Sequence, residues 1–177
     1  MKFPIQLIPT KTKLVPLPSS ESVELPVCQP VFRRWNGKPL DFDFGTKPIV
    51  DDHGKPAFAE LALLSLLRSS GWDGVWVSAF GGIHFLREMP SSWKLASHHV
   101  AIPKEKDEFL RTIWKVAGAK ACFDILAWKD ADILFCEAKY GRDKLTEAER
   151  KFVQAAMQCE VPSDSLMIAE WRFNKEV

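Results

Sequence analysis

The chain of 177 residues has only four cysteines and four histidines, a net charge of +1 and no long apolar run. Neither residue type shows the spacing of zinc ligands, so the sequence indicates no zinc site. No apolar run approaches the ~18 residues of a membrane helix, and the N-terminus lacks a signal-peptide pattern. We therefore expect a cytoplasmic protein with no membrane partner and with reduced thiols. The small net charge excludes a broad basic surface for nucleic acid and leaves only a local patch.

Apolar residues are plentiful, at 46% of the chain with seven tryptophans and twelve phenylalanines. This content is enough to build one buried core. The prolines are uneven, because nine of the twelve lie in residues 1–56. Since proline disfavours helices, residues 1–56 are predicted to be an extended, loop-rich extension packed on the core. Within it, residues 31–35 and 38–44 flank Asn36-Gly37, a pattern typical of a β-hairpin.

Two apolar runs in the second half of the chain carry the most informative charges. Residues 123–128 contain Asp124, and residues 133–139 include Glu137 and Lys139, with a short polar loop between the runs. Both runs are predicted as strands of one hairpin. Alternation places Glu137 and Lys139 on the same face of their strand, about 7 Å apart along it. Because burying an unpaired charge is costly, these groups indicate either a cation site beside an ammonium or a buried structural ion pair.

The same acid-x-lysine pattern occurs again in residues 149–151. This second copy lies in a polar stretch where Thr146 and Glu149 predict a capping box, so that a helix begins at Glu147. At such a polar helix start, Glu149 and Lys151 are predicted to be solvated. Only the first copy sits in an apolar strand with another strand-borne acid nearby.

Further predicted elements surround the hairpin. The order of elements in the core, residues 57–177, is helix, strand, strand hairpin, helix and strand, which predicts an α/β fold. Residues 80–118 form an insertion in this core. The elements outside the hairpin are a helix over residues 56–70, a strand over 75–79, an inserted helix beginning near Pro103, a helix beginning at Glu147 and a last strand over 165–171.

Together these features resemble the PD-(D/E)xK, or restriction-endonuclease-like, nuclease superfamily, and within it the VRR-NUC family. That family carries an aspartate on one strand, Glu-x-Lys on the next, a charged turn, a helix with a glutamine, and a glutamate on the first core helix. The resemblance covers about residues 57–171, with Phe123 in place of a frequent proline. It implies a restriction-endonuclease-like core, with a mixed central sheet flanked by helices, a β-rich N-terminal extension and an inserted helix. The matching positions are Asp124, Glu137-Ala138-Lys139, Arg142-Asp143-Lys144-Leu145, Gln154 and Glu60.

Glu60 is unusual even without the family. Helical spacing puts it on the same face as Leu63, Leu64 and Leu67, where an unpaired carboxylate is unexpected. The alternative is a glutamate near the positive end of the helix dipole that faces solvent at the rim. The strand-borne acids that it would face favour a metal site.

Phosphodiester hydrolysis requires charge to be neutralised on the attacking water, the phosphate oxygens and the leaving oxygen, which Mg²⁺ or Mn²⁺ held by carboxylates can do. The resemblance therefore implies a Mg²⁺- or Mn²⁺-dependent endonuclease that cleaves duplex or branched DNA. Lys139 is expected to stabilise the transition state, and Gln154 to bind the water or the phosphate. The alternative is a catalytically inactive nucleic-acid-binding or assembly module with the same fold. The expected metal ligands are Asp124, Glu137, Glu60 and the backbone carbonyl of Ala138.

Cations near the predicted cleft would hold the DNA backbone through salt-sensitive, largely sequence-independent contacts. For three of them, Lys144, Arg150 and Lys151, the alternative is a solvated helix start. Arg142 is the strongest single candidate because it follows the strand that carries Lys139. The sequence leaves open whether the chain forms a homodimer and whether it needs a protein partner. The full set of predicted contacts is Lys120, Lys129, Arg142, Lys144, Arg150 and Lys151.

Overall fold

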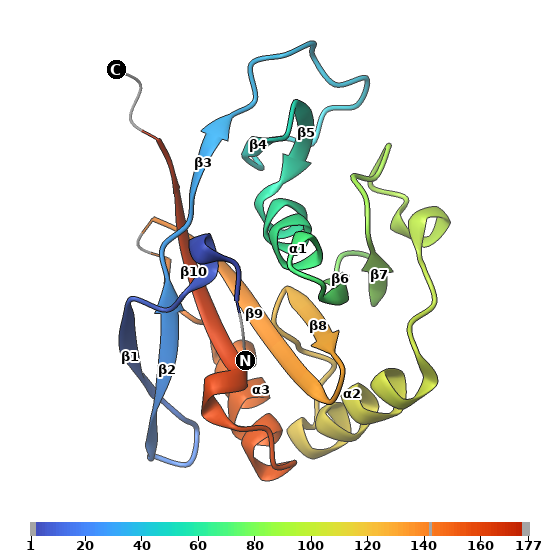
Figure 1. Ribbon diagram of the computed structural model, residues 1–177. Coiled ribbons are helices and arrows are strands. Elements are labelled where there is room, and N and C mark those ends of the chain that lie inside the picture. The colour runs from blue at the N-terminus through green and yellow to red at the C-terminus, as the bar shows by residue number, and fades with distance from the viewer. Residues whose placement is uncertain (1–2, 142, 175–177) are drawn as a thin grey trace.

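The computed structural model describes residues 3–141 and 143–174, and in these residues the chain is a mixed α/β protein built around one curled sheet (Figure 1). The strand order is β5-β4-β3-β10-β9-β8-β6-β7, and β2 pairs with both β1 and β10. Strand β10 runs parallel to β9, β2 and β3, whereas the other pairs are antiparallel. The sheet is therefore mixed, as predicted.

The predicted order of helix, strand, strand hairpin, helix and strand is present. The hairpin register pairs Ile125 with Cys136 and Lys129 with Asp132, so Asp124 lies just before its strand, beside Glu137 on the next one. The six elements of the hairpin and its surroundings are α1 (Ala59–Ser69), β6 (Asp73–Ser78), the hairpin strands β8 (Ile125–Lys129) and β9 (Asp132–Tyr140), α3 (Glu147–Gln158) and β10 (Leu166–Phe173).

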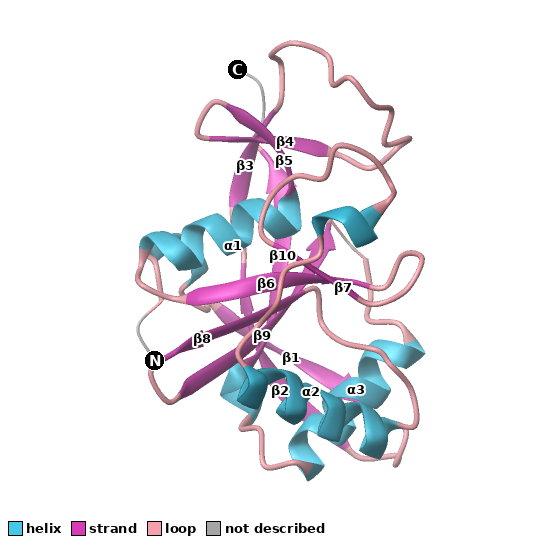
Figure 2. Cartoon of the chain, turned by 90° about the vertical axis from the view of Figure 1, so that its right-hand side faces the viewer, coloured by secondary structure: helices cyan, strands magenta, loops and turns pink. Residues whose placement is uncertain are grey.

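Two apolar cores lie on the two faces of the sheet. Helix α1 packs on one face, and α2 (Lys104–Ala117) and α3 pack on the other (Figure 2). Helix α3 begins where the sequence predicts, because Thr146 Oγ1 accepts from the backbone N–H of Glu149 at 3.3 Å and Glu149 Oε2 accepts from the N–H of Thr146 at 2.8 Å. This reciprocal pair satisfies two N–H groups of the helix start.

The N-terminal residues lengthen the central sheet, because two of their strands pair with β10. Strand β10 pairs with β2 through Ile168 and Ala169 and with β3 through Arg172 and Phe173. The short helical turn η1 (Ile5–Leu7) precedes the first strand. The five strands of this region are β1 (Lys11–Pro16), β2 (Ser22–Cys28), β3 (Val31–Arg34), β4 (Ile49–Asp52) and β5 (Lys55–Phe58).

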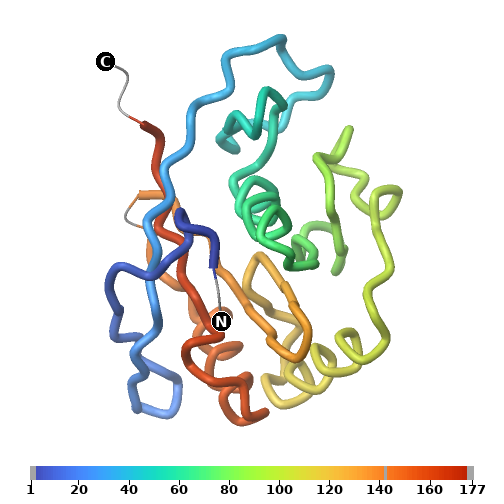
Figure 3. The backbone as a smooth tube through the Cα atoms, viewed as in Figure 1, coloured from blue at the N-terminus to red at the C-terminus, as the bar shows by residue number. Residues whose placement is uncertain are grey.

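Two predictions for this region are wrong. Residues 38–44 do not pair with β3, since β3 pairs with β10 on one side and β4 on the other, and residues 35–48 form a loop, the light-blue tube of Figure 3. The tight hairpin turn lies instead at His53-Gly54, where both residues have positive φ. Pro56 does not begin a helix but lies on the edge strand β5, where its missing N–H is tolerated.

Residues 80–118, predicted to be an insertion, contain a strand and two helical segments. Strand β7 (His84–Leu86) extends the sheet beside β6, and the turn η2 (Leu95–His98) follows. Helix α2 follows Pro103, as predicted, and ends at Gly118, whose φ of +66° suits glycine. A last turn, η3 (Ser163–Ser165), leads into β10.

Among residues 3–141 and 143–174, no helix is both long and apolar enough to span a membrane. The four cysteines are free, as predicted. Cys28 and Cys136 are buried, and burial raises the pKa of both thiols.

Candidate functional site

Two hydrogen bonds join Asp124 to Glu137 and Ala138 at the open end of the β8–β9 hairpin, opposite its turn. The backbone N–H of Asp124 donates to Glu137 Oε2 at 3.1 Å, and the N–H of Ala138 donates to Asp124 Oδ2 at 3.0 Å. The carbonyl of Asp124 accepts from the N–H of Val77 at 2.7 Å, which ties this position to β6 as well. The structure therefore brings together the two carboxylates that the sequence predicts, and the backbone of two strands holds them.

Lys139 contacts two carboxylates on a buried face of the sheet. Its Nζ lies 2.8 Å from Glu137 Oε1 and 2.8 Å from Glu149 Oε2, and the three side chains are only 10%, 4% and 17% exposed. The prediction that Glu137 and Lys139 share a face is confirmed. The prediction that Glu149 is solvated is wrong. Glu149 is the third residue of α3, and its side chain turns back toward the helix start to close the capping box. In this orientation its carboxylate also contacts Lys139.

Glu60 is buried in the first turn of α1 and bonded to a lysine that the sequence analysis missed. Lys47 Nζ lies 2.6 Å from Glu60 Oε1, and it also lies 4.8 Å from the ring centre of Phe58 and 5.4 Å from that of Trp76. Lys47 comes from the loop between β3 and β4, where no periodicity marks it. Only the folding of that loop over α1 places it beside Glu60.

The ionisation of this group reflects burial and crowding of like charges. Burial, and then the nearby charge of Glu60, raise the pKa of Asp124 to about 7, although the Ala138 N–H, Lys47 and Lys139 act in the opposite direction. Burial, Asp124 and Glu149 likewise raise the pKa of Glu137. Burial disfavours the Lys139 ammonium, but Glu137 and Glu149 outweigh it and raise the pKa of Lys139.

We call these six side chains the carboxylate–lysine cluster: Glu60, Asp124, Glu137, Glu149, Lys47 and Lys139. Four carboxylates face two ammonium groups, so the fully ionised cluster carries two unmatched negative charges. Two of its oxygens, Asp124 Oδ1 and Glu60 Oε2, make no hydrogen bond or ion pair with the described residues. The donor set therefore fits a hard divalent cation, which binds carboxylate oxygens and often takes only one or two protein ligands.

The predicted convergence of Glu60, Asp124 and Glu137 on one cation-sized point is not present in this arrangement. Among the residues that the structure describes, no three histidine, cysteine, aspartate or glutamate side chains are grouped so that they could hold a metal ion. In this arrangement the orientation of Glu137 is fixed by Lys139 at Oε1 and by the Asp124 N–H at Oε2. Each of these oxygens keeps a second lone pair that is free to bind a cation.

Gln154 lies apart from this cluster. Its Oε1 accepts from the backbone N–H of Ser19, in the turn between β1 and β2, at 3.0 Å. Gln154 is five residues beyond Glu149 on α3, which corresponds to about 7.5 Å along the helix axis. In the described residues no contact joins Gln154 to Asp124, Glu137 or Lys139.

The predicted nucleic-acid contacts scatter over the molecule, and Arg142 lies outside the described residues. Lys129 is at the far end of the hairpin, roughly 17 Å along β8 from Asp124, where its Nζ donates to the carbonyl of Ser70 at the end of α1. Its predicted place near the cleft is therefore wrong, because the two ends of a strand cannot share a site. Lys151 forms an exposed pair with Glu147 on the outer face of α3.

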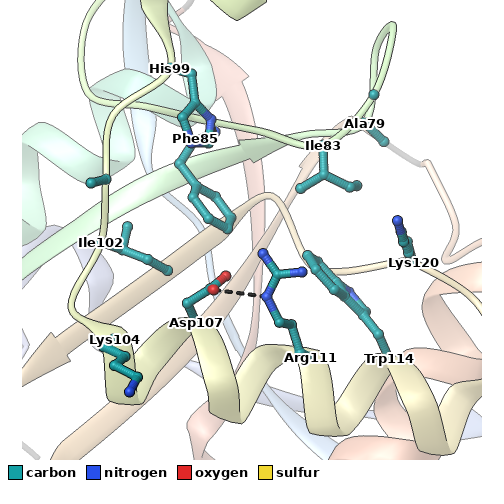
Figure 4. A pocket seen from close by; sticks show the side chains of 12 residues that line it. Ala79, Ile83, Phe85, His99, Ile102, Lys104, Asp107, Arg111, Trp114 and Lys120 are labelled. Atoms are coloured by element: carbon teal, nitrogen blue, oxygen red, sulfur yellow. Dashed lines mark hydrogen bonds and ion pairs between the residues drawn. The ribbon is translucent and has the colours of Figure 1, made fainter.

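Lys120 lines a cavity of about 760 Å³ between the β6–β7 region and α2 (Figure 4). Arg111 and Trp114 project into it from α2, and Arg111 Nε lies 2.8 Å from Asp107 Oδ2. Lys120 is four residues before Asp124 in the sequence, but none of the six side chains of the cluster lines this cavity. The last two predicted nucleic-acid contacts, Lys144 and Arg150, line a different cavity, between α3 and β1.

No protein-family model, curated protein or solved structure matches this chain. Its function must therefore be argued from the cluster itself. The cluster joins residues from the β3–β4 loop, α1, the β8–β9 hairpin and α3 at one end of the sheet.

Proposed function

We propose that this chain is a Mg²⁺- or Mn²⁺-dependent endonuclease of the PD-(D/E)xK superfamily, closest to VRR-NUC, that hydrolyses phosphodiester bonds in DNA. The observation that carries the proposal is the buried carboxylate–lysine cluster, in which four carboxyl groups face only two ammonium groups. Buried charges are retained only when they are paired or bind an ion. The order of strands β6, β8, β9 and β10, with one helix on each side of the hairpin in sequence, supports a restriction-endonuclease-like core.

Asp124 and Glu60 would hold the metal through their unengaged oxygens, with Glu137 and the Ala138 carbonyl as further oxygen ligands. The bound ion would lower the pKa of a water and neutralise charge on the phosphate. The Ala138 N–H fixes the orientation of Asp124 by holding its other oxygen. The sheet thus presents one oxygen of Asp124 in a defined direction.

Lys139 would act on the substrate directly. Its ammonium, kept protonated by Glu137 and Glu149, would stabilise negative charge that develops on the phosphate or orient the attacking water. Glu149 acts as a positioning residue, because it holds Lys139 and is itself held by the Thr146 N–H. Lys120, which lines the cavity between α2 and the β6–β7 region, would contact the DNA backbone.

One observation favours the second candidate, an inactive nucleic-acid-binding or assembly module. Glu60 and Glu137 are each bonded to a lysine, so the cluster is partly a closed ion-pair network. Such a network can serve structure alone. The excess of two carboxylates favours the enzyme.

The test is cleavage of linear, flap and branched DNAs by purified protein with Mg²⁺, Mn²⁺ or EDTA. We expect products with either metal, none in EDTA, and none with Glu137→Gln, which keeps the shape of the side chain. If every substrate stays intact in both metals while the protein binds DNA, the inactive module is correct. Cleavage that persists in excess EDTA contradicts the metal mechanism.

A further inference from the structure

A second cavity, of about 730 Å³, lies on the β2 side of β10, between β1 and the start of α3. Four cationic side chains and one carboxylate line it, so its lining has a net charge of +3, whereas the net charge of the whole chain is only +1. We call it the basic cavity. Two of its cations come from the N-terminal hairpin and two from the turn and helix that follow β9. The charged residues are Lys11, Lys13, Lys144, Arg150 and Glu170.

The cations of the basic cavity are held in place but not neutralised. Glu170 binds both hairpin lysines, with Lys11 Nζ at 2.7 Å and Lys13 Nζ at 2.8 Å. Although burial opposes it, these two lysines lower the pKa of Glu170, so the carboxylate is ionised and fixes both ammonium groups. Arg150 Nε is buried and has no hydrogen-bond partner among residues 3–141 and 143–174. An anion with several acceptor oxygens would complete this set, and arginine suits phosphate in particular.

The basic cavity adjoins the carboxylate–lysine cluster. Glu170 is the register partner of Lys139 on the neighbouring strand, so their side chains lie on one face of the sheet, about 4.8 Å apart between strand axes. On α3, Arg150 directly follows Glu149, which binds Lys139. The β1–β2 hairpin completes the far wall, and it lies beside β10 in Figure 1.

We propose that the basic cavity binds a backbone phosphate of the nucleic-acid strand, a few nucleotides from the phosphodiester that Asp124 and Lys139 face. The inference rests on the proposed function for the position of the scissile bond. The spacing is suitable, because the cavity begins one strand from Lys139 and phosphates on one strand recur every 3.4 Å of helix axis. The N-terminal hairpin is then part of the DNA interface, through Lys11 and Lys13.

Binding in EDTA tests this separately from cleavage. The affinity for a fluorescein-labelled DNA is measured by anisotropy from about 50 to 200 mM salt, in which each lost phosphate contact reduces the slope of log K against log salt by about 0.9 for duplex. Arg150→Gln, Lys13→Gln and Lys144→Gln are each expected to reduce the slope by about this amount. Lys144 is exposed, so its replacement leaves the fold intact, and in Lys13→Gln the carboxylate of Glu170 keeps Lys11. Arg33→Gln, an exposed arginine on β3 outside the cavity, is the matched control and keeps the wild-type slope.

Wild-type slopes in all three cavity variants overturn the inference. A second arm measures the thermal midpoint in inorganic phosphate against chloride at equal ionic strength. If phosphate stabilises the wild type but not Arg150→Gln, and the DNA slopes stay unchanged, the cavity holds a free anion and the strand proposal is wrong. The cleavage assay separates the two proposals. If the cavity variants reduce the salt slope of DNA binding but the protein cleaves no DNA, only the nuclease proposal is contradicted. If the protein cleaves DNA with metal but the cavity variants keep the wild-type salt slope, only the cavity proposal is contradicted.

Discussion

The two acid-x-lysine tripeptides, Glu137-Ala138-Lys139 and Glu149-Arg150-Lys151, have the same pattern and very different surroundings. In the first, alternation along β9 turns both charges to one buried face, where they contact each other. In the second, helical geometry separates them. Glu149 points back to Lys139, whereas Lys151 pairs with Glu147 in solvent. The comparison teaches that a short pattern acquires its chemistry from the period of the element that carries it.

The largest expected effect concerns the first tripeptide. Glu137→Gln removes a carboxylate next to the proposed metal site, and Lys139→Ala removes the ammonium that faces the phosphate. Each change is expected to lower kcat by about 10²-fold or more, since a single well-placed group contributes that much to a transition state. Single-turnover cleavage in Mg²⁺, with circular dichroism as a check of folding, measures this. Retention of more than a tenth of the wild-type rate by both variants contradicts the assigned roles.

Next in size is the effect of Asp124→Asn on stability without metal. The folded-state pKa of Asp124 is about 7, well above the ordinary ~3.9. A raised carboxyl pKa means that the folded state holds its proton longer, so stability falls as pH rises from about 4 to 7 and is lowest above pH 7. Asn at this position stays neutral and can still accept from the Ala138 N–H. We expect it to flatten this pH dependence and to increase the free energy of unfolding at pH 8 by on the order of a few kcal/mol.

Urea titrations in EDTA from pH 4 to 8 measure this effect, with Asp43→Asn on the exposed β3–β4 loop as a control. Adding Mg²⁺ should raise the thermal midpoint of the wild type, because a ligand of the folded state stabilises it by mass action. The rise should be much smaller in Asp124→Asn. A variant that melts well below the wild type and keeps its full metal response would make Asp124 a structural residue.

A smaller effect is expected at Glu149, the acid of the second tripeptide. Glu149→Gln preserves the capping box, which accepts Glu or Gln at this position, but removes one negative charge from Lys139. We expect a loss of about tenfold in kcat, or 1.4 kcal/mol, with little change in KM, because Lys139 is held less firmly. A rise in KM in place of the fall in kcat, or a fall in the thermal midpoint that accounts for the rate loss, would indicate a purely structural role for Glu149.

The smallest effect is expected at Lys151, the other end of the second tripeptide. Lys151→Ala removes an exposed i,i+4 pair with Glu147, which contributes about 0.3–0.5 kcal/mol to the helix. Cleavage should change less than twofold, and the thermal midpoint by a degree or two at most. An effect as large as that of Glu149→Gln would remove the distinction between the two ends of this tripeptide.

Features that depend on neighbouring residues could be predicted from the sequence. The hairpin, the capping box at Thr146 and Glu149, and the shared face of Glu137 and Lys139 are all present. Each depends on a period of two or 3.6 residues or on a cap, and these are local properties of the chain. The pairing of Asp124 with Glu137 also follows, because the short loop of the hairpin sets the register.

Only the tertiary structure decided which charges meet across long stretches of chain. It brought Lys47 to Glu60 and Glu149 to Lys139, and it placed Lys11 and Lys13 on Glu170. It also separated Lys129 and Gln154 from the cluster. In addition, it paired β3 with β10 and β4 instead of with residues 38–44. These outcomes depend on which strands pair and where loops close. Such choices are made by the burial of the whole sheet and leave no periodic trace in the residues concerned.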